Sequence, residues 1–348
     1  MRRFLCIIFL IFLFAAVPTS SFAQELTAPT VPAEFESLMP GKEVSFSDGL
    51  LAMLQKGLPT AYTEISKAMK TGTAVFCCVF LVSILQSMGC KAAAAEIAGA
   101  VCISSLMLHS SRTLIALAVK TITEISEYSK LLFPVLVAAS SAQGGAISAT
   151  ALGVGTSAFT AFLTNVLCRI LIPVVYLFLA ASIANCAVGE EALKKIRDQL
   201  RKLSTWFLKS ILTIFLTYMS ITGAVTGTAD KTAVKAAKAA ISTVVPVIGS
   251  TLADASESLL LSAGLIKNSI GIYGIFAFGA LFMLPFLRIG VHYLMMKGIA
   301  ALCAIVGSKR ITELTEDFGS AMGLLLGMTG TICALSVIGS VCFLKGAG

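Results

Sequence analysis

The sequence predicts an all-α, polytopic integral membrane protein with about six to eight membrane segments. Of its 348 residues, 57% are hydrophobic and only 13% are charged, whereas soluble globular proteins average about 45–50% apolar and roughly 25% charged residues. Long charge-free runs recur along the chain. They lack the alternation of apolar and polar residues that the strands of an outer-membrane barrel show. These observations exclude a water-soluble fold and favour helical spans.

The charge balance and the cysteines exclude two further classes of protein. There are 26 Lys and Arg against 18 Asp and Glu, a net charge of +8. The cations lie between uncharged runs and do not form the dense basic patch that nucleic-acid binding requires. Apart from Cys6, the cysteines lie in or beside the later apolar runs, and the chain has no C-x-x-C pair. We therefore expect cysteines that pack as small apolar side chains, and no metal or other cofactor.

The N-terminus has the features of a signal peptide over residues 1–23. Arg2 and Arg3 precede an apolar run, and a small-x-small site ends at Ala23. Cleavage there would place the new N-terminus outside the cytoplasm. An uncleaved anchor is the alternative, because the apolar run is long for a signal peptide. Residues 24–70 are interpreted as a proline-rich extracytoplasmic linker followed by a short surface helix over 47–70.

Three membrane regions are expected after the linker: N-terminal helices at 71–130 and two repeats at 131–229 and 230–344. A spanning helix needs about 20 mostly apolar residues. The runs that satisfy this length are Thr71–Cys90, Ala92–Ser111 (with only Glu96 and His109 charged or titratable), Leu131–Cys168, Ile170–Gly189, Ser210–Ala229, Asn268–Leu287 and Phe318–Leu344.

Proline spacing suggests an internal duplication with re-entrant segments. Pro134 and Pro173 are as far apart as Pro246 and Pro285. The run Leu131–Cys168 is too long for one crossing and contains several glycines, so we expect it to enter and leave the membrane on one side. The predicted break or hinge residues are Pro134, Gly144, Gly145, Pro173, Pro246, Gly249 and Pro285.

A basic amphipathic helix is predicted between two spans, over residues 190–205. A second charged connector covers residues 297–317. The positive-inside bias places both connectors in the cytoplasm, and with re-entrant segments both would emerge there. The first connector is a candidate docking site for a partner, carried by Lys194, Lys195, Arg197, Arg201 and Lys202.

Charged residues within apolar segments are costly and are therefore candidate functional sites. Glu96 and Arg169 are interpreted as an ion pair or as part of a polar lining. Asp254 and Glu257 share one helix face, where they would handle a cation or proton, or form the wet end of a surface helix. Lys209, Lys267 and Arg288 lie near segment ends, where long side chains reach the headgroups.

No constellation of catalytic residues is present in the sequence. His109 and His292 have no partner at the spacing of a metal-binding motif, and no nucleophile is paired with a base by a recognisable motif. We therefore predict no catalytic, cofactor-binding or metal residues and no enzymatic activity.

Four short segments in the last third of the chain resemble the stage III sporulation protein AE family of endospore-forming bacteria. They are ADKT at 229–232, VPVIG at 245–249, AD at 253–254 and LIKNSIG at 265–271. Lys231 stands where the family more often has glycine. The resemblance extends in layout over residues 51–344.

The resemblance implies a non-enzymatic, multi-span subunit of a secretion-like channel between mother cell and forespore, needed for endospore development. It implies the mother-cell-derived outer forespore membrane as the location. The implied partners are other proteins of the stage III sporulation operon, including a cytoplasmic ATPase, and a forespore-side protein. The alternative is a secondary or ABC-permease-like transporter of a small solute, with Glu96, Asp254 and Glu257 handling a coupling ion if transport is secondary.

Overall fold

The computed structural model describes residues 28–39, 46–88, 92–142, 146–244, 249–306 and 308–345, without the side chains of 33, 46, 47, 50, 54, 92, 93, 146–148, 219–267 and 345. Within these residues the chain is helical and contains no strand, which confirms the all-α prediction. The elements are α2 (Ala33–Glu36), α3 (Phe46–Ser87), α4 (Ala92–Ala142), α5 (Ala146–Val166), the π-helix η2 (Leu167–Leu171), α6 (Ile172–Val188), α7 (Glu191–Val244), α8 (Gly249–Val306) and α9 (Lys309–Lys345).

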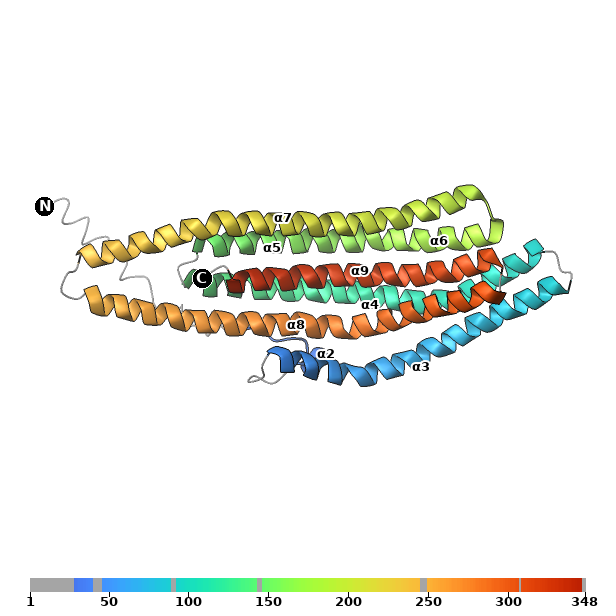
Figure 1. Cartoon of the computed structure of the whole chain (residues 1–348), viewed down its shortest axis with the longest axis horizontal. Coiled ribbons are helices and arrows are strands. Elements are labelled where there is room, and N and C mark those ends of the chain that lie inside the picture. The colour runs from blue at the N-terminus through green and yellow to red at the C-terminus, as the bar shows by residue number, and fades with distance from the viewer. Residues whose placement is uncertain are drawn as a thin grey trace.

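The long helices lie side by side and alternate in direction (Figure 1). α5, η2 and α6 follow one another as a single rod, so this rod counts as one member of the bundle. One end of the bundle, called here the connector end, is where α3 gives way to α4, α6 to α7 and α8 to α9. The two charged connectors of the sequence therefore lie at the same end of the molecule.

The predicted re-entrant segment within residues 131–168 is wrong, and helix continuity is the reason. α4 continues through Pro134 to Ala142, and α5 then runs antiparallel to it. The charge-free run 131–168 is thus the end of one long helix and the beginning of the next. Proline is tolerated inside such helices where neighbouring helices satisfy the freed backbone groups. Within the described residues, the up-and-down path of the helices brings both connectors to one end.

The other predicted break residues have mixed outcomes. Pro173 lies in the first turn of α6, within the continuous rod, and Pro285 lies inside α8. Gly249 is the first residue of α8. Gly144, Gly145 and Pro246 lie outside the described residues. The predicted duplication stays a prediction.

Among the described residues, five helical stretches are long and apolar enough to cross a membrane, which agrees with a polytopic membrane protein. They are Leu51–Ser87, Ala94–Ala142, Ala149–Val188, Asn268–Val306 and Lys309–Leu344, of 36 to 49 residues each. A crossing needs only about 20 residues. Each helix is therefore longer than the hydrocarbon core is thick, and part of it extends into or beyond the headgroups unless it is strongly tilted.

The predicted surface helix at 47–70 is instead the first half of α3. This helix packs along α8, and two glycines permit the close approach. A Cβ atom on Gly57 would lie 3.1 Å from Leu287, and one on Gly72 would collide with the Ile299 side chain. Small residues at such positions let neighbouring membrane helices pack closely. α3 is therefore part of the bundle.

α9 lies in the middle of the bundle together with α4, because it contacts α4, α5, α6, α7 and α8. Aromatic side chains fill the space around it: Phe343 of α9 stacks on Phe133 of α4 with ring centroids 6.1 Å apart. Phe278 of α8 meets the ring of Tyr128 edge-on at 5.3 Å. Among the charged residues early in α9, Asp317 is buried with 8% of its side chain exposed, whereas Glu316 is 49% exposed.

Candidate docking site at the connector end

A glycine makes the reversal between α6 and α7 possible. Gly189 caps α6 with φ of 78°, a left-handed conformation that disfavours side chains, and its N–H donates to the Asn185 carbonyl at 2.9 Å. A Cβ atom there would collide with the Arg310 guanidinium. The turn therefore begins α7 directly beside the start of α9.

Arg197 of α7 lies at the centre of an ion-pair cluster. Its side chain is only 8% exposed. Nη1 donates to Glu313 Oε2 and to Asp317 Oδ2, each at 3.1 Å, while Nε and Nη2 donate to Asp198 Oδ1 at 3.1 and 3.0 Å. Lys194 Nζ approaches Glu313 Oε1 at 3.5 Å. We call these five residues the Arg197 cluster.

The neighbouring charges keep Arg197 protonated. Burial alone would lower the pKa of the guanidinium, but the carboxylates of Asp317, Glu313 and Asp198 outweigh it and raise the pKa above its ordinary value. Because Glu313 and Asp317 are one helical turn apart on α9, both face the same guanidinium. The cluster thus ties the α6–α7 hairpin to the α8–α9 hairpin.

Two further ion pairs join other helices to α9 at this end. Lys297 of α8 donates to Glu316 at 2.8 Å. Arg310 donates to Glu96 of α4 at 3.0 Å. Glu96 therefore pairs with Arg310, and the predicted pair with Arg169 is wrong. Arg169 lies in η2 and is exposed. Four hairpin-forming helices, α4, α7, α8 and α9, are connected by these contacts.

The five cations predicted as a docking site divide into two groups. Arg197 is buried, and Lys194 is half-buried and engaged with Glu313. Lys195, Arg201 and Lys202 are exposed on the outer side of α7. Lys195 has a loose contact with Glu191 at 3.9 Å, and such exposed pairs contribute little.

Two residues outside the prediction complete the exposed surface. Trp206 is 62% exposed, and Lys209 is exposed one turn further along α7. A shallow groove of about 450 Å³ follows this side of the helix, lined by Asp198, Arg201, Lys202, Thr205, Trp206 and Lys209. We call Lys195, Arg201, Lys202, Trp206 and Lys209 the α7 face. Lysines seven residues apart were the sequence signal for it, at positions 195, 202 and 209.

Other predicted membrane charges have different surroundings. Arg288 does not simply extend to the headgroups: its Nε lies 3.4 Å from Glu64 Oε1, which joins α8 to α3. Asp254, Glu257 and Lys267 have side chains outside the described set, so a role in ion handling stays a prediction. Among the described residues, no three His, Cys, Asp or Glu side chains gather as a metal site.

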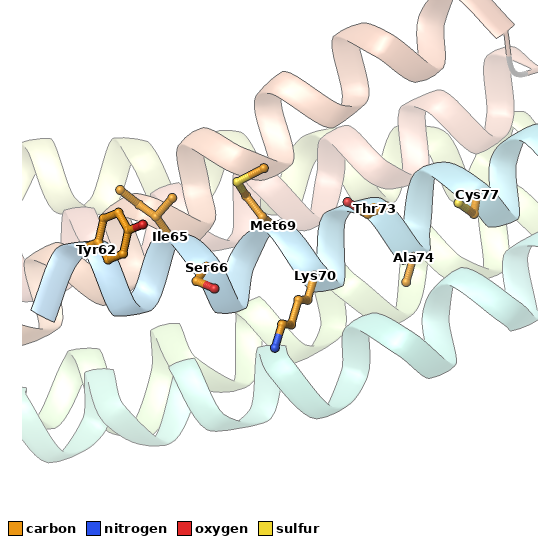
Figure 2. Close-up of a pocket in the computed structure, with 8 residues that line it drawn as sticks. All are labelled: Tyr62, Ile65, Ser66, Met69, Lys70, Thr73, Ala74 and Cys77. Atoms are coloured by element: carbon orange, nitrogen blue, oxygen red, sulfur yellow. The ribbon is translucent and has the colours of Figure 1, made fainter.

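A second surface groove runs along α3, with a volume of about 680 Å³ (Figure 2). Figure 2 shows Lys70 on one side of the helix and Ile65 and Met69 on the opposite side. Tyr62 is 78% exposed and Met69 52%. The groove is lined by Tyr62, Ile65, Ser66, Met69, Lys70, Thr73, Ala74 and Cys77, all from α3. An exposed apolar helix face of this kind is expected where a candidate span meets lipid.

The fold and the connector end together define a multi-span helical membrane protein, with long helices held at one end by internal ion pairs. The chain belongs to the stage III sporulation protein AE family, whose model matches residues 36–344. It is therefore a sporulation membrane protein.

One relative is the protein named stage III sporulation protein AE of Bacillus subtilis (strain 168). It is 28% identical to the chain over 174 residues. That match covers 49% of this chain and 43% of the relative, so it spans less than half of either protein. No solved structure is significantly similar to the chain.

Proposed function

We propose that the chain is a non-enzymatic membrane subunit of the channel that connects mother cell and forespore, and that it docks a cytoplasmic partner through the α7 face. The observation that supports the docking role is that the cations of the first connector, residues 190–205, divide into a buried group and an exposed group. Arg197 and Lys194 are used inside the bundle, whereas Lys195, Arg201 and Lys202 face outward. Membership of a sporulation family supports the wider setting.

The α7 face has the composition of a protein interface. Arg201 and Trp206 are of the residue types most enriched among interface residues with large binding contributions. Lys202 and Lys209 make no ion pair with any described residue, so their charges are available to a partner. Ile196 and Leu203, which are 52% and 50% exposed, add apolar area on the same helix. The matching partner surface is acidic with an apolar centre.

The proposed partner is the cytoplasmic ATPase of the stage III sporulation operon. A basic connector end is retained in the cytoplasm by the positive-inside bias, which supports contact with a cytoplasmic protein. The other proposed partners are the remaining proteins of that operon and a forespore-side protein. The proposed location is the mother-cell-derived outer forespore membrane.

Charge reversal on the α7 face tests the docking role. We expect Lys195→Glu, Arg201→Glu and Lys202→Glu, combined in one chain, to reduce recovery of the ATPase in affinity purification from sporulating cells by at least tenfold. Like charges placed opposite an acidic surface cost several kcal/mol. Spore yield should fall in parallel. Quantitative immunoblotting of the purified complex and of total membranes measures both binding and the amount of the chain.

Lys130→Glu is the matched control, because Lys130 is an exposed lysine in the half of α4 away from the connector end. It should leave ATPase recovery unchanged. Equal recovery with the triple variant and with the native chain, at equal membrane abundance, would show that the α7 face is not the docking site.

A further inference from the structure

A small, partly open cavity lies where α4, α8 and α9 meet. Its volume is about 10 Å³, and three methionines line it: Met107 of α4, Met296 of α8 and Met322 of α9. They are buried, with exposed fractions of 3%, 1% and 3%. The remaining lining residues are Ser110, Ser111, Leu114, His292 and Phe318. Sulfur-containing side chains from three helices therefore line one small cavity.

His292 is held in a state suited to bind a ligand. Its Nδ1 lies 2.9 Å from the Arg288 carbonyl oxygen. Because a carbonyl only accepts, Nδ1 carries the proton, and in the neutral ring Nε2 keeps its lone pair. Metal-binding histidines are commonly oriented by such a bond from the second ring nitrogen. His292 is 93% buried and one helical turn from Met296, so both residues project from the same face of α8.

A second polar group in the lining has no partner. Ser111 is 2% exposed, and its Oγ makes no hydrogen bond within the described residues. A buried hydroxyl without a partner costs about 1–3 kcal/mol, so such groups usually meet a water molecule or a bound ligand. A cavity of this size accommodates about one water molecule or one ion.

The geometry points to a binding site for a single soft monovalent cation, Cu(I), with Met107, Met296, Met322 and His292 as its ligands. Thioethers favour Cu(I), and imidazole suits copper as well, whereas Mg²⁺ and Ca²⁺ require oxygen ligands. No carboxylate lines the cavity. All four ligands are neutral, so they do not compensate the charge of a bound ion. Burying an uncompensated charge is costly, and a monovalent cation is therefore favoured over a divalent one.

The test is a Cu(I) titration of the purified full chain in nanodiscs, under anaerobic reducing conditions, against a chromogenic Cu(I) chelator. The cysteines are first replaced by serine or alanine, because thiolates also bind Cu(I). We expect one ion per chain and X-ray absorption that reports sulfur and nitrogen neighbours. Met296→Leu, Met322→Leu and His292→Ala should each weaken Cu(I) binding at least tenfold.

Met328→Leu is the control, because Met328 is fully buried on α9 but does not line the cavity. It should bind as the unsubstituted chain does. Methionine and leucine are similar in volume, so the thermal midpoints of all these variants should stay close, which separates loss of a ligand from misfolding. Absence of Cu(I) binding, or equal loss in Met328→Leu, would overturn the proposal.

Discussion

Replacing Arg197 by methionine should destabilise the protein by about 3–5 kcal/mol, because it leaves buried carboxylates without their cation. Arg197 and Asp317 are each only 8% exposed, so solvent screens their interaction little. The two hairpins that meet at the connector end should separate first. Limited proteolysis and the thermal midpoint of the chain in nanodiscs measure the loss.

A compensating variant separates the charge from the packing. Arg197→Met combined with Asp317→Asn and Glu313→Gln removes the buried charges together, and this should recover most of the lost stability. Lys195→Met is the matched control, because Lys195 is 79% exposed two residues earlier in the same helix. An Arg197→Met chain as stable as the Lys195→Met chain would contradict the role of the cluster.

Replacing Phe278 by alanine should destabilise the protein by about 3–5 kcal/mol. The side chain is fully buried on α8, and its ring lies 5.3 Å from that of Tyr128 and 6.4 Å from that of Phe133, both on α4. Removing it leaves a cavity where α4 and α8 pack. Packing is a main source of helix association inside a bilayer. Thermal unfolding in nanodiscs checks the effect.

Phe286→Ala is the matched control for this second prediction. Phe286 is on the same helix but 44% exposed, so its removal opens no enclosed cavity. Phe286→Ala should lower the stability of the protein much less than Phe278→Ala does. Equal losses for the two variants would mean that the contact between α4 and α8 is not a principal source of stability.

The helical membrane class and the shared end of the two connectors followed from the sequence. Charge-free length and the positions of the cations are sufficient for that, because membrane helices need about 20 apolar residues and retain cations outside the hydrocarbon core. The re-entrant segment predicted at 131–168 was wrong because this charge-free run of 38 residues was treated as one unit. No local signal distinguishes a broken segment from the meeting of two long helices.

The inward position of Arg197 could have been predicted from the spacing of residues along α7. Arg197, Ser204, Leu208, Ile211 and Phe215 are spaced by seven, four, three and four residues, and all are buried. Such spacing follows one face of a helix. An arginine in register with that apolar face requires acidic partners, and Glu313 and Asp317 were both in the second connector.

The partners of Glu96 and the methionine cavity were not predictable from spacing. Glu96 and Arg310 are 214 residues apart, and the cavity takes its sulfur atoms from three helices. Short motifs report neighbours within one element, whereas these sites exist only through the packing of α4 and α8 around α9. Such contacts depend on the order and tilt of the helices, which a single sequence does not specify.

Thiol labelling of the connector end tests the central claim that the α7 face is cytosolic while Arg197 is enclosed. In a cysteine-free chain, a membrane-impermeant maleimide should label Lys195→Cys in inverted vesicles and leave it unlabelled in intact cells. Ser204→Cys, at a buried position on the same side of α7 as Arg197, should be labelled far less than Lys195→Cys in the same vesicles. Labelling of Lys195→Cys in intact cells, or equal labelling at both positions in vesicles, would contradict the account.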